Sequence, residues 1–213
     1  MLRTDSGISS CFRKRKGDCG CDRERQGTSS ETGPLSSVSS GSKSFRWRSD
    51  RNDIARYADP TGWWADASVL GRLGPALAAL FEDARPTLIM GPESRGALVG
   101  ALVATHLEVG LVEMRKDPSP ATDSDRWLIA HTPPDYRDRT LRVGARRDHL
   151  KAGERVLLVD DWIDTGGQAT AARALVDAAG ATWCGVAVIV DALNDSRLRR
   201  DLRVRTLLTL HEL

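Results

Sequence analysis

Apolar residues along most of the chain fall into two kinds of pattern, short continuous runs and longer segments with helical spacing. The runs that predict buried strands are TLIMG (87–91), VGLVEM (109–114), VLLV (156–159), GVAVIVDAL (185–193) and RVRTLLTL (203–210). The segments that predict helices are ADASVLGRLGPALAALFEDA (65–84), ALVGALVATHL (97–107) and QATAARALVDAAG (168–180). Apolar strands that alternate with helices predict an α/β, Rossmann-like parallel sheet with helices on both faces.

Two further segments refine this pattern. Asp66 is placed to cap the first helix, and Gly74-Pro75 predicts either a kink or a later start of that helix. Residues 117–140 are polar and rich in proline, and a loop of this length inside a domain is usually functional or mobile. We expect a short hairpin around Trp127–Ala130 within it.

Composition divides the 213-residue chain near residue 45. Residues 1–45 are rich in Ser, Gly, Arg and Lys, so we expect a disordered tail, although a start codon assigned too far upstream would look the same. Residues 46–213 are expected to form one domain. Of the 31 Lys/Arg and 29 Asp/Glu, the tail holds 8 and 5 and the domain holds 23 and 24. This balance gives the domain no electrostatic reason to bind nucleic acid.

Long apolar segments are absent from the sequence. No run approaches the ~18 residues of a membrane span, and the first residues lack the apolar region of a secretory signal. We therefore expect a cytoplasmic protein with no membrane partner.

Three of the predicted strands end in chemically distinctive residues, which are PESRG (92–96), Arg115-Lys116 and DDWIDTGG (160–167). In a parallel sheet, ligands bind beyond the carboxyl ends of the strands. Three such ends at one edge of the sheet therefore predict a binding site there.

The last of these ends has a direct chemical interpretation. Residues 164–168 turn from a strand into a helix, so their backbone N–H groups and the positive end of the helix dipole favour a phosphate. Asp160 and Asp161 come just before this turn, and carboxylates accept hydrogen bonds from vicinal hydroxyls and bind Mg²⁺. A phosphate site next to two acceptors for a diol predicts a ribose 5-phosphate site.

Other acidic or glycine-rich motifs fit this stretch less well. A receiver domain needs a later lysine, and none follows Lys151. An aspartic protease loop leads into β structure, whereas a helix is predicted here, and a haloacid dehalogenase loop needs Asp-x-Asp. The P-loop and the dinucleotide-binding glycine motif are both absent.

The stretch VLLVDDWIDTGGQ (156–168) resembles the phosphoribosyl pyrophosphate (PRPP) motif of type I phosphoribosyltransferases. The resemblance implies that Asp160 and Asp161 hold the ribose hydroxyls. It also implies that the 5-phosphate is bound by Asp164, Thr165, Gly166, Gly167 and Gln168. Gln168 departs from the Thr or Ser that is usual in the family, and its amide N–H is a substitute for the lost hydroxyl contact.

Upstream, LIMGPESRGALVG (88–100) and VEMRK (112–116) resemble the adenine phosphoribosyltransferase subfamily. The residues that this resemblance assigns to pyrophosphate are Glu93, Ser94, Arg95, Gly96, Arg115 and Lys116. A small variable hood would hold the base, and residues 46–70 and the C-terminal strand are its candidates. The loop over 117–140 would close over PRPP and exclude water.

The implied activity is that of a Mg²⁺-dependent pentosyltransferase of nucleotide salvage. It would join a nucleobase, with an adenine-like purine favoured, to C1 of PRPP and release pyrophosphate. Asp160, Asp161 and Asp164 would be the catalytic residues, Asp164 would accept the proton of the base, and Asp160 and Asp161 are the candidate Mg²⁺ ligands. A non-catalytic regulator that senses PRPP or a nucleotide is the alternative, and a scaffold without PRPP affinity is a third reading. The acceptor base and the oligomeric state, including a homodimer, stay open.

Overall fold

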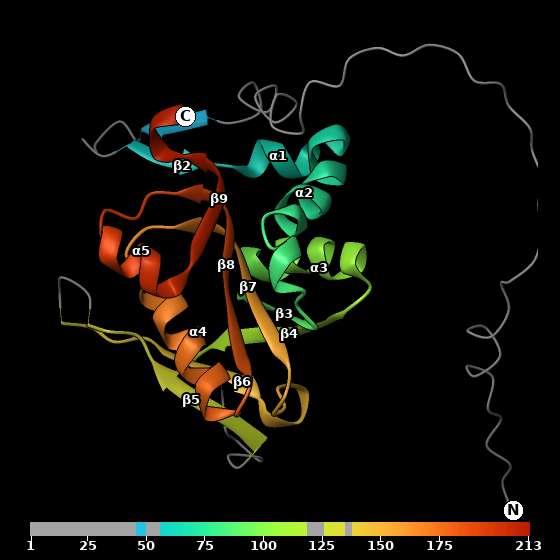
Figure 1. The fold of residues 1–213 in the computed structure, drawn as a ribbon. Coiled ribbons are helices and arrows are strands. Elements are labelled where there is room, and N and C mark those ends of the chain that lie inside the picture. The colour runs from blue at the N-terminus through green and yellow to red at the C-terminus, as the bar shows by residue number, and fades with distance from the viewer. Residues whose placement is uncertain (1–45, 50–55, 119–125, 135–137) are drawn as a thin grey trace, which may run out of the picture. The chain divides into compact units, whose positions relative to one another are not determined.

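The computed structural model describes residues 46–49, 56–118, 126–134 and 138–213, so the predicted tail over 1–45 lies outside the described residues. A seven-stranded sheet with the strand order β5-β6-β4-β3-β7-β8-β9 forms the centre of the described part (Figure 1). Its strands are β3 (Leu88–Pro92), β4 (Gly110–Lys116), β5 (Trp127–His131), β6 (Arg142–Arg146), β7 (Arg155–Ile163), β8 (Thr182–Asp191) and β9 (Val204–Thr209). The strands from β4 to β9 in this order are parallel, and β6 and β5 continue the sheet in antiparallel pairing.

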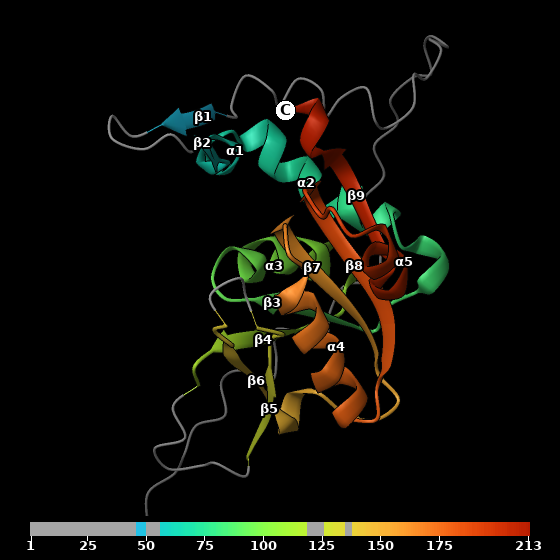
Figure 2. The same cartoon turned by 90° about the vertical axis from the view of Figure 1, so that its left-hand side faces the viewer.

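Helices cover both faces of this sheet, as the sequence predicted. They are α1 (Thr61–Ala65), α2 (Ala67–Ala79), α3 (Arg95–Leu107), α4 (Gly167–Ala178) and α5 (Ser196–Leu202). Figures 1 and 2 show α2 and α3 on one face and α4 and α5 on the other. Neighbouring strand residues contribute to opposite cores: Ile89 and Leu157 join the α2–α3 side, whereas Met90 and Leu158 join the α4 side. The central strands are buried on both faces, which explains their continuous apolar runs.

The first long helix begins where its sequence signal placed it. The side chain of Asp66 accepts hydrogen bonds from the backbone N–H groups of Ser68 and Val69, which confirms the N-cap. Pro75 does not mark a later start, because α2 runs through it from Ala67 to Ala79. Proline removes a hydrogen bond to the carbonyl of Gly71, and the helix tolerates this because both residues are exposed to water.

Several boundaries differ from the prediction. β7 extends beyond VLLV as far as Ile163, because it pairs with β8 along its whole length. The expected hairpin around Trp127–Ala130 exists, but its second strand is β6, after the loop rather than within it. The sequence patterns did not predict β1 (Arg46–Ser49), β2 (Arg56–Asp59), β6, α1 or α5, because short segments with mixed polarity carry little periodic signal.

The segment before α2 and the end of the chain lie at one end of the sheet. An antiparallel hairpin of β1 (Arg46–Ser49) and β2 (Arg56–Asp59) precedes α1, and a 3-10 helix over Leu210–Glu212 follows β9. Both views place them at the end of the sheet where β7, β8 and β9 finish. Among the described residues, no helix is long and apolar enough to cross a membrane.

Candidate active site

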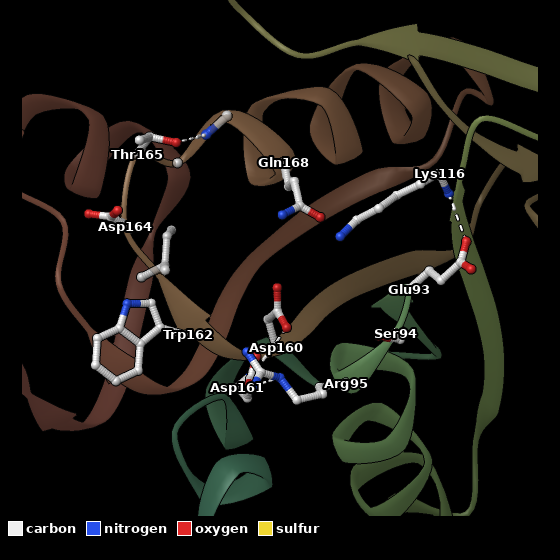
Figure 3. Close-up of a pocket in the computed structure, with 13 residues that line it drawn as sticks. Glu93, Ser94, Arg95, Lys116, Asp160, Asp161, Trp162, Asp164, Thr165 and Gln168 are labelled. Carbon is white, nitrogen blue, oxygen red and sulfur yellow. Dashed lines mark hydrogen bonds and ion pairs between the residues drawn. The ribbon is translucent and has the colours of Figure 1, made fainter. Parts of the chain in front are cut away.

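A pocket of about 470 Å³ lies where β3, β4 and β7 end (Figure 3). This volume is within the range typical of small-molecule sites. The residues that line it are Glu93, Ser94, Arg95, Lys116, Asp160, Asp161, Trp162, Ile163, Asp164, Thr165, Gly166, Gly167 and Gln168. All three strand ends that the sequence singled out therefore meet in one pocket.

The turn between β7 and α4 is built around Gly166. This residue has a φ of 74°, and a Cβ at this position would lie 2.8 Å from Cδ2 of Leu198, so the turn requires glycine. The N–H of Thr170 donates to the carbonyl of Gly166 at 2.9 Å and begins the helical ladder. The N–H groups of the preceding turn have no acceptor within the helix and suit an anion. Gly167 has no positive φ, and a Cβ there would meet its neighbours only at 3.6 Å or more.

The two adjacent acids lie within β7 rather than after it. Asp161 is 5% exposed, and its Oδ2 lies 2.7 Å from Nε of Arg95 in an ion pair that does not meet hydrogen-bond geometry. Figure 3 shows the carboxyl group of Asp160 pointing into the pocket and that of Asp161 facing Arg95. Arg95, which the resemblance assigned to pyrophosphate, thus contacts one of the two predicted ribose ligands in the free protein.

The electrostatics of Asp160 are unfavourable to its ionised form. Burial raises the pKa of Asp160 well above its ordinary value of 3.8, the charge of Asp161 raises it further, and Lys116 opposes both effects. In the free protein, Asp160 therefore retains its proton to a higher pH than an aspartate that is exposed to water.

Four residues predicted for pyrophosphate line the pocket, and two do not. Glu93 Oε2 accepts a hydrogen bond from the backbone N–H of Lys116 at 3.0 Å, which ties the end of β3 to the end of β4. Gly96 lies beneath the pocket, where a Cβ would come 2.7 Å from Oδ1 of Asp160, so this glycine makes room for the acid. Arg115 is exposed and lies 3.9–4.0 Å from Glu113 and Glu93. It does not line the pocket as its neighbour Lys116 does, because successive residues of a strand face opposite sides.

The end of β5 borders the turn that begins α4. A Cβ on Gly167 would lie 3.6 Å from Cβ of Thr132 and 3.9 Å from Cδ of Pro133. The N–H of Thr132 donates to the carbonyl of Leu141, and the N–H of Leu141 donates to Oγ1 of Thr132, each at 2.9 Å. Residues 119–125 and 135–137 of the predicted lid lie outside the described residues.

Two pocket residues lie outside the set of site residues that the sequence predicted. Trp162 and Ile163 occupy the two variable positions between the acid pair and Asp164, and both line the pocket. Trp162 also packs against the core on the α2–α3 side. Their place inside the motif was the signal that could have identified them. When the acids on both sides of a short segment line a pocket, the residues between those acids lie close to the pocket as well.

Comparison with known proteins identifies the class. Residues 72–209 match the family model described as the phosphoribosyl transferase domain, so the chain belongs to this family. An adenine phosphoribosyltransferase from Synechococcus sp. is 36% identical over 153 residues, which cover 70% of this chain and 82% of that protein. Another from Myxococcus xanthus is 35% identical over 156 residues, which cover 72% and 82%.

Solved structures agree with this result. The adenine phosphoribosyltransferase from Rhodothermus marinus has a TM-score of 0.70 and 28% identity, over 83% of this chain and 99% of that one. The enzyme from Trypanosoma brucei, solved in complex with AMP, pyrophosphate and ribose-5-phosphate, has a TM-score of 0.66 and 27% identity, over 87% and 84%. The predicted type I phosphoribosyltransferase fold is confirmed, and the relatives support an enzyme rather than a regulator.

Proposed function

We propose that this protein transfers the 5-phosphoribosyl group of PRPP to adenine, with release of pyrophosphate. One observation carries the proposal: a single pocket joins a glycine turn at a helix N-terminus, two adjacent acids and two basic side chains. These groups match a phosphate, a diol and a pyrophosphate in the order in which PRPP presents them. The names of the relatives supply adenine as the favoured acceptor.

Each group in the pocket has a role in this reaction. Residues 164–168 bind the 5-phosphate through the N–H groups that begin α4. Asp160 and Asp161 accept hydrogen bonds from the ribose hydroxyls and favour the positive charge that grows on the sugar. Arg95 and Lys116 balance the negative charge of the leaving pyrophosphate. For Arg95 to do so, it must leave Asp161, and the arriving hydroxyls then replace it as partners of that acid.

Asp160 and Asp161 are also the candidate ligands of the expected Mg²⁺. Among the described residues, no group of three or more His, Cys, Asp or Glu side chains is placed to hold a metal ion. Mg²⁺ in such sites is commonly held by one or two carboxylates and by the phosphates of the substrate. Asp160 and Asp161 fit that pattern and would hold Mg²⁺ that arrives with PRPP. The bound ion would supply charge neutralisation to the pyrophosphate.

The base lies beyond the acid pair, on the side of Trp162 and Asp164. Asp164 is exposed to the pocket, where its carboxylate accepts the proton of the attacking base nitrogen. Residues 46–70 and the C-terminal segment form the hood over this base. Asp164 is also the one feature that favours a 6-oxopurine, because the adenine subfamily usually has alanine here and the hypoxanthine type has aspartate.

The domain boundary at residue 46 and the closing loop over 117–140 are part of the proposal. The homodimer and the cytoplasmic location stay predictions.

The test is a pyrophosphate-release assay with PRPP, Mg²⁺ and a panel of adenine, hypoxanthine, guanine, xanthine, uracil and orotate. We expect turnover with adenine and little with the pyrimidines. The matched control is the Asp160→Asn, Asp161→Asn double variant, which retains shape and acceptor oxygens but lacks the charges. Faster turnover with hypoxanthine than with adenine would show that hypoxanthine is the preferred acceptor. Tight PRPP binding without turnover of any base would show that the protein is a sensor and not an enzyme.

A further inference from the structure

Gln168 presents a buried acceptor to the pocket. It is the second residue of α4, and Figure 3 shows its amide pointing into the pocket rather than along the helix. Its Oε1 is buried and has no hydrogen-bond partner among the described residues. A buried amide oxygen without a donor is unfavourable, which indicates that the site provides a donor when it is in use.

Lys116 provides such a donor from the opposite side. Its backbone N–H is fixed by Glu93, but its ammonium group makes no hydrogen bond or ion pair with any residue in the described ranges. Figure 3 shows the ammonium of Lys116 and the amide of Gln168 pointing toward one another across the pocket. Lys116 also lines the pocket, and its charge lowers the pKa of Asp160.

Hydrogen-bonding capacity restricts how these groups combine with a phosphorylated sugar. A lysine ammonium only donates, ionised phosphate oxygens only accept, and a glutamine amide does both. The amide NH₂ cannot donate to Lys116, and Oε1 cannot accept from a phosphate. In the arrangement that satisfies all three groups, Oε1 accepts from Lys116 and the NH₂ donates to a phosphate oxygen.

We propose that the Gln168 side chain is a positioning residue that links the two phosphate-binding ends of the pocket, by holding the Lys116 ammonium on the pyrophosphate side while donating to the substrate. This rests on the proposed function, because it takes PRPP as the ligand. A threonine or serine at this position would place a hydroxyl beside the helix N-terminus, on a shorter side chain than the one that faces Lys116 in Figure 3. The glutamine of this chain is therefore more than a substitute for the missing hydroxyl.

The experiment uses variants of matched shape and two probes. Gln168→Met retains the length of the side chain and removes its hydrogen bonds, and Gln168→Thr restores only the hydroxyl. Inorganic pyrophosphate and AMP are titrated separately by calorimetry with Mg²⁺ present, because pyrophosphate lacks a 5-phosphate and AMP lacks a pyrophosphate. Melting temperatures of the free variants check that the fold is retained.

We expect both variants to bind pyrophosphate about tenfold more weakly than the parent, because each loses one hydrogen bond that involves a charged group. The threonine variant is expected to retain AMP affinity within threefold. In a Lys116→Met background, adding Gln168→Met should reduce pyrophosphate affinity less than threefold, because Gln168 is proposed to act on this probe through Lys116.

Pyrophosphate affinity within twofold of the parent for Gln168→Met would overturn the proposal, as would an equal loss of pyrophosphate affinity in both backgrounds. These titrations need no base, so they are independent of turnover. A parent that forms no AMP from adenine and PRPP but shows the coupling would refute the proposed acceptor and leave this inference in place.

Discussion

Replacing Gly167 by valine is expected to remove most of the PRPP affinity without unfolding the protein. The Cβ of such a side chain would meet Thr132 and Thr165 at ordinary van der Waals distance, so the free protein accommodates it. Gly167 lines the pocket, so the two methyl groups would add bulk beside the N–H groups that begin α4. Losing two charge-assisted hydrogen bonds at roughly 1.5–3 kcal/mol each corresponds to at least about a hundredfold in affinity.

Gly166→Ala is the matched control, because it is expected to lower the stability of the free protein, which Gly167→Val should leave almost unchanged. Its φ of 74° is costly for alanine, by about 1–2 kcal/mol, and the new Cβ would also crowd Cδ2 of Leu198. In a protein of this size, roughly 1 kcal/mol changes the melting temperature by 2–4 °C. Thermal melts without ligand should therefore show a loss of several degrees for Gly166→Ala and little change for Gly167→Val.

Calorimetric titration of PRPP with Mg²⁺ present measures the PRPP affinity of the parent and of Gly167→Val. Equal PRPP affinity of the parent and Gly167→Val would remove the 5-phosphate from this turn and, with it, the main geometric support for the proposed chemistry. A larger loss of stability for Gly167→Val than for Gly166→Ala would show that the backbone reasoning at the turn is wrong.

Two further changes test other parts of the structure. Arg95→Met is expected to lower the melting temperature by a few degrees, because it leaves the buried carboxylate of Asp161 without its ion-pair partner. The same variant is expected to bind pyrophosphate more weakly, and an unchanged melting temperature with unchanged pyrophosphate binding would contradict the contact. Deletion of residues 1–44, whose composition predicts no contribution to a core, is expected to leave the melting temperature and PRPP affinity unchanged, and a loss of either would place part of the functional domain in that segment.

The sequence predicted the parallel core and the glycine turn well, because both depend on local patterns. Continuous apolar runs mark strands buried on two faces, and the strand-to-helix turn needs glycine at a fixed place, which proved to be Gly166. The strand β6, which lies between β5 and β4, was missed because RVGAR has no alternation that would distinguish it from a loop. Its strand conformation depends on pairing with β5 and with the end of β4, which are tertiary contacts.

The candidate site was predicted as a set of residues but not as an arrangement. Spacing indicated that Arg95, Lys116 and the acids meet at one edge of the sheet, and the pocket brings them together. Spacing could not indicate that Arg95 pairs with Asp161 in the free protein or that Gly96 lies beneath Asp160. These relations depend on how closely α3 approaches β7, which is set by packing rather than by any local motif.

Replacing Asp160 by asparagine is expected to stabilise the free protein while abolishing turnover. The amide retains the shape and the oxygen that accepts the N–H of Asp161 at 2.9 Å, but it removes a charge that burial and Asp161 both disfavour. The pKa of Asp160 is higher in the folded protein than the 3.8 of an unfolded chain. Above pH 3.8 the unfolded chain therefore releases this proton first, and stability falls as the pH rises toward the folded pKa.

Asparagine does not titrate, so the melting temperature of the variant minus that of the parent should increase as the pH rises above 3.8 and level off above the folded pKa. Each unit by which the folded pKa exceeds the unfolded one contributes about 1.4 kcal/mol at the plateau, or a few degrees in a protein of this size. Melts of both proteins without ligand, from pH 4.5 to 8 in steps of about half a unit, measure this difference. A variant that is less stable than its parent at pH 8, or a difference independent of pH, would mean that Asp160 is ionised at no cost in the folded protein. Greater stability together with lost turnover would instead show that this carboxylate is maintained for the substrate and not for the fold.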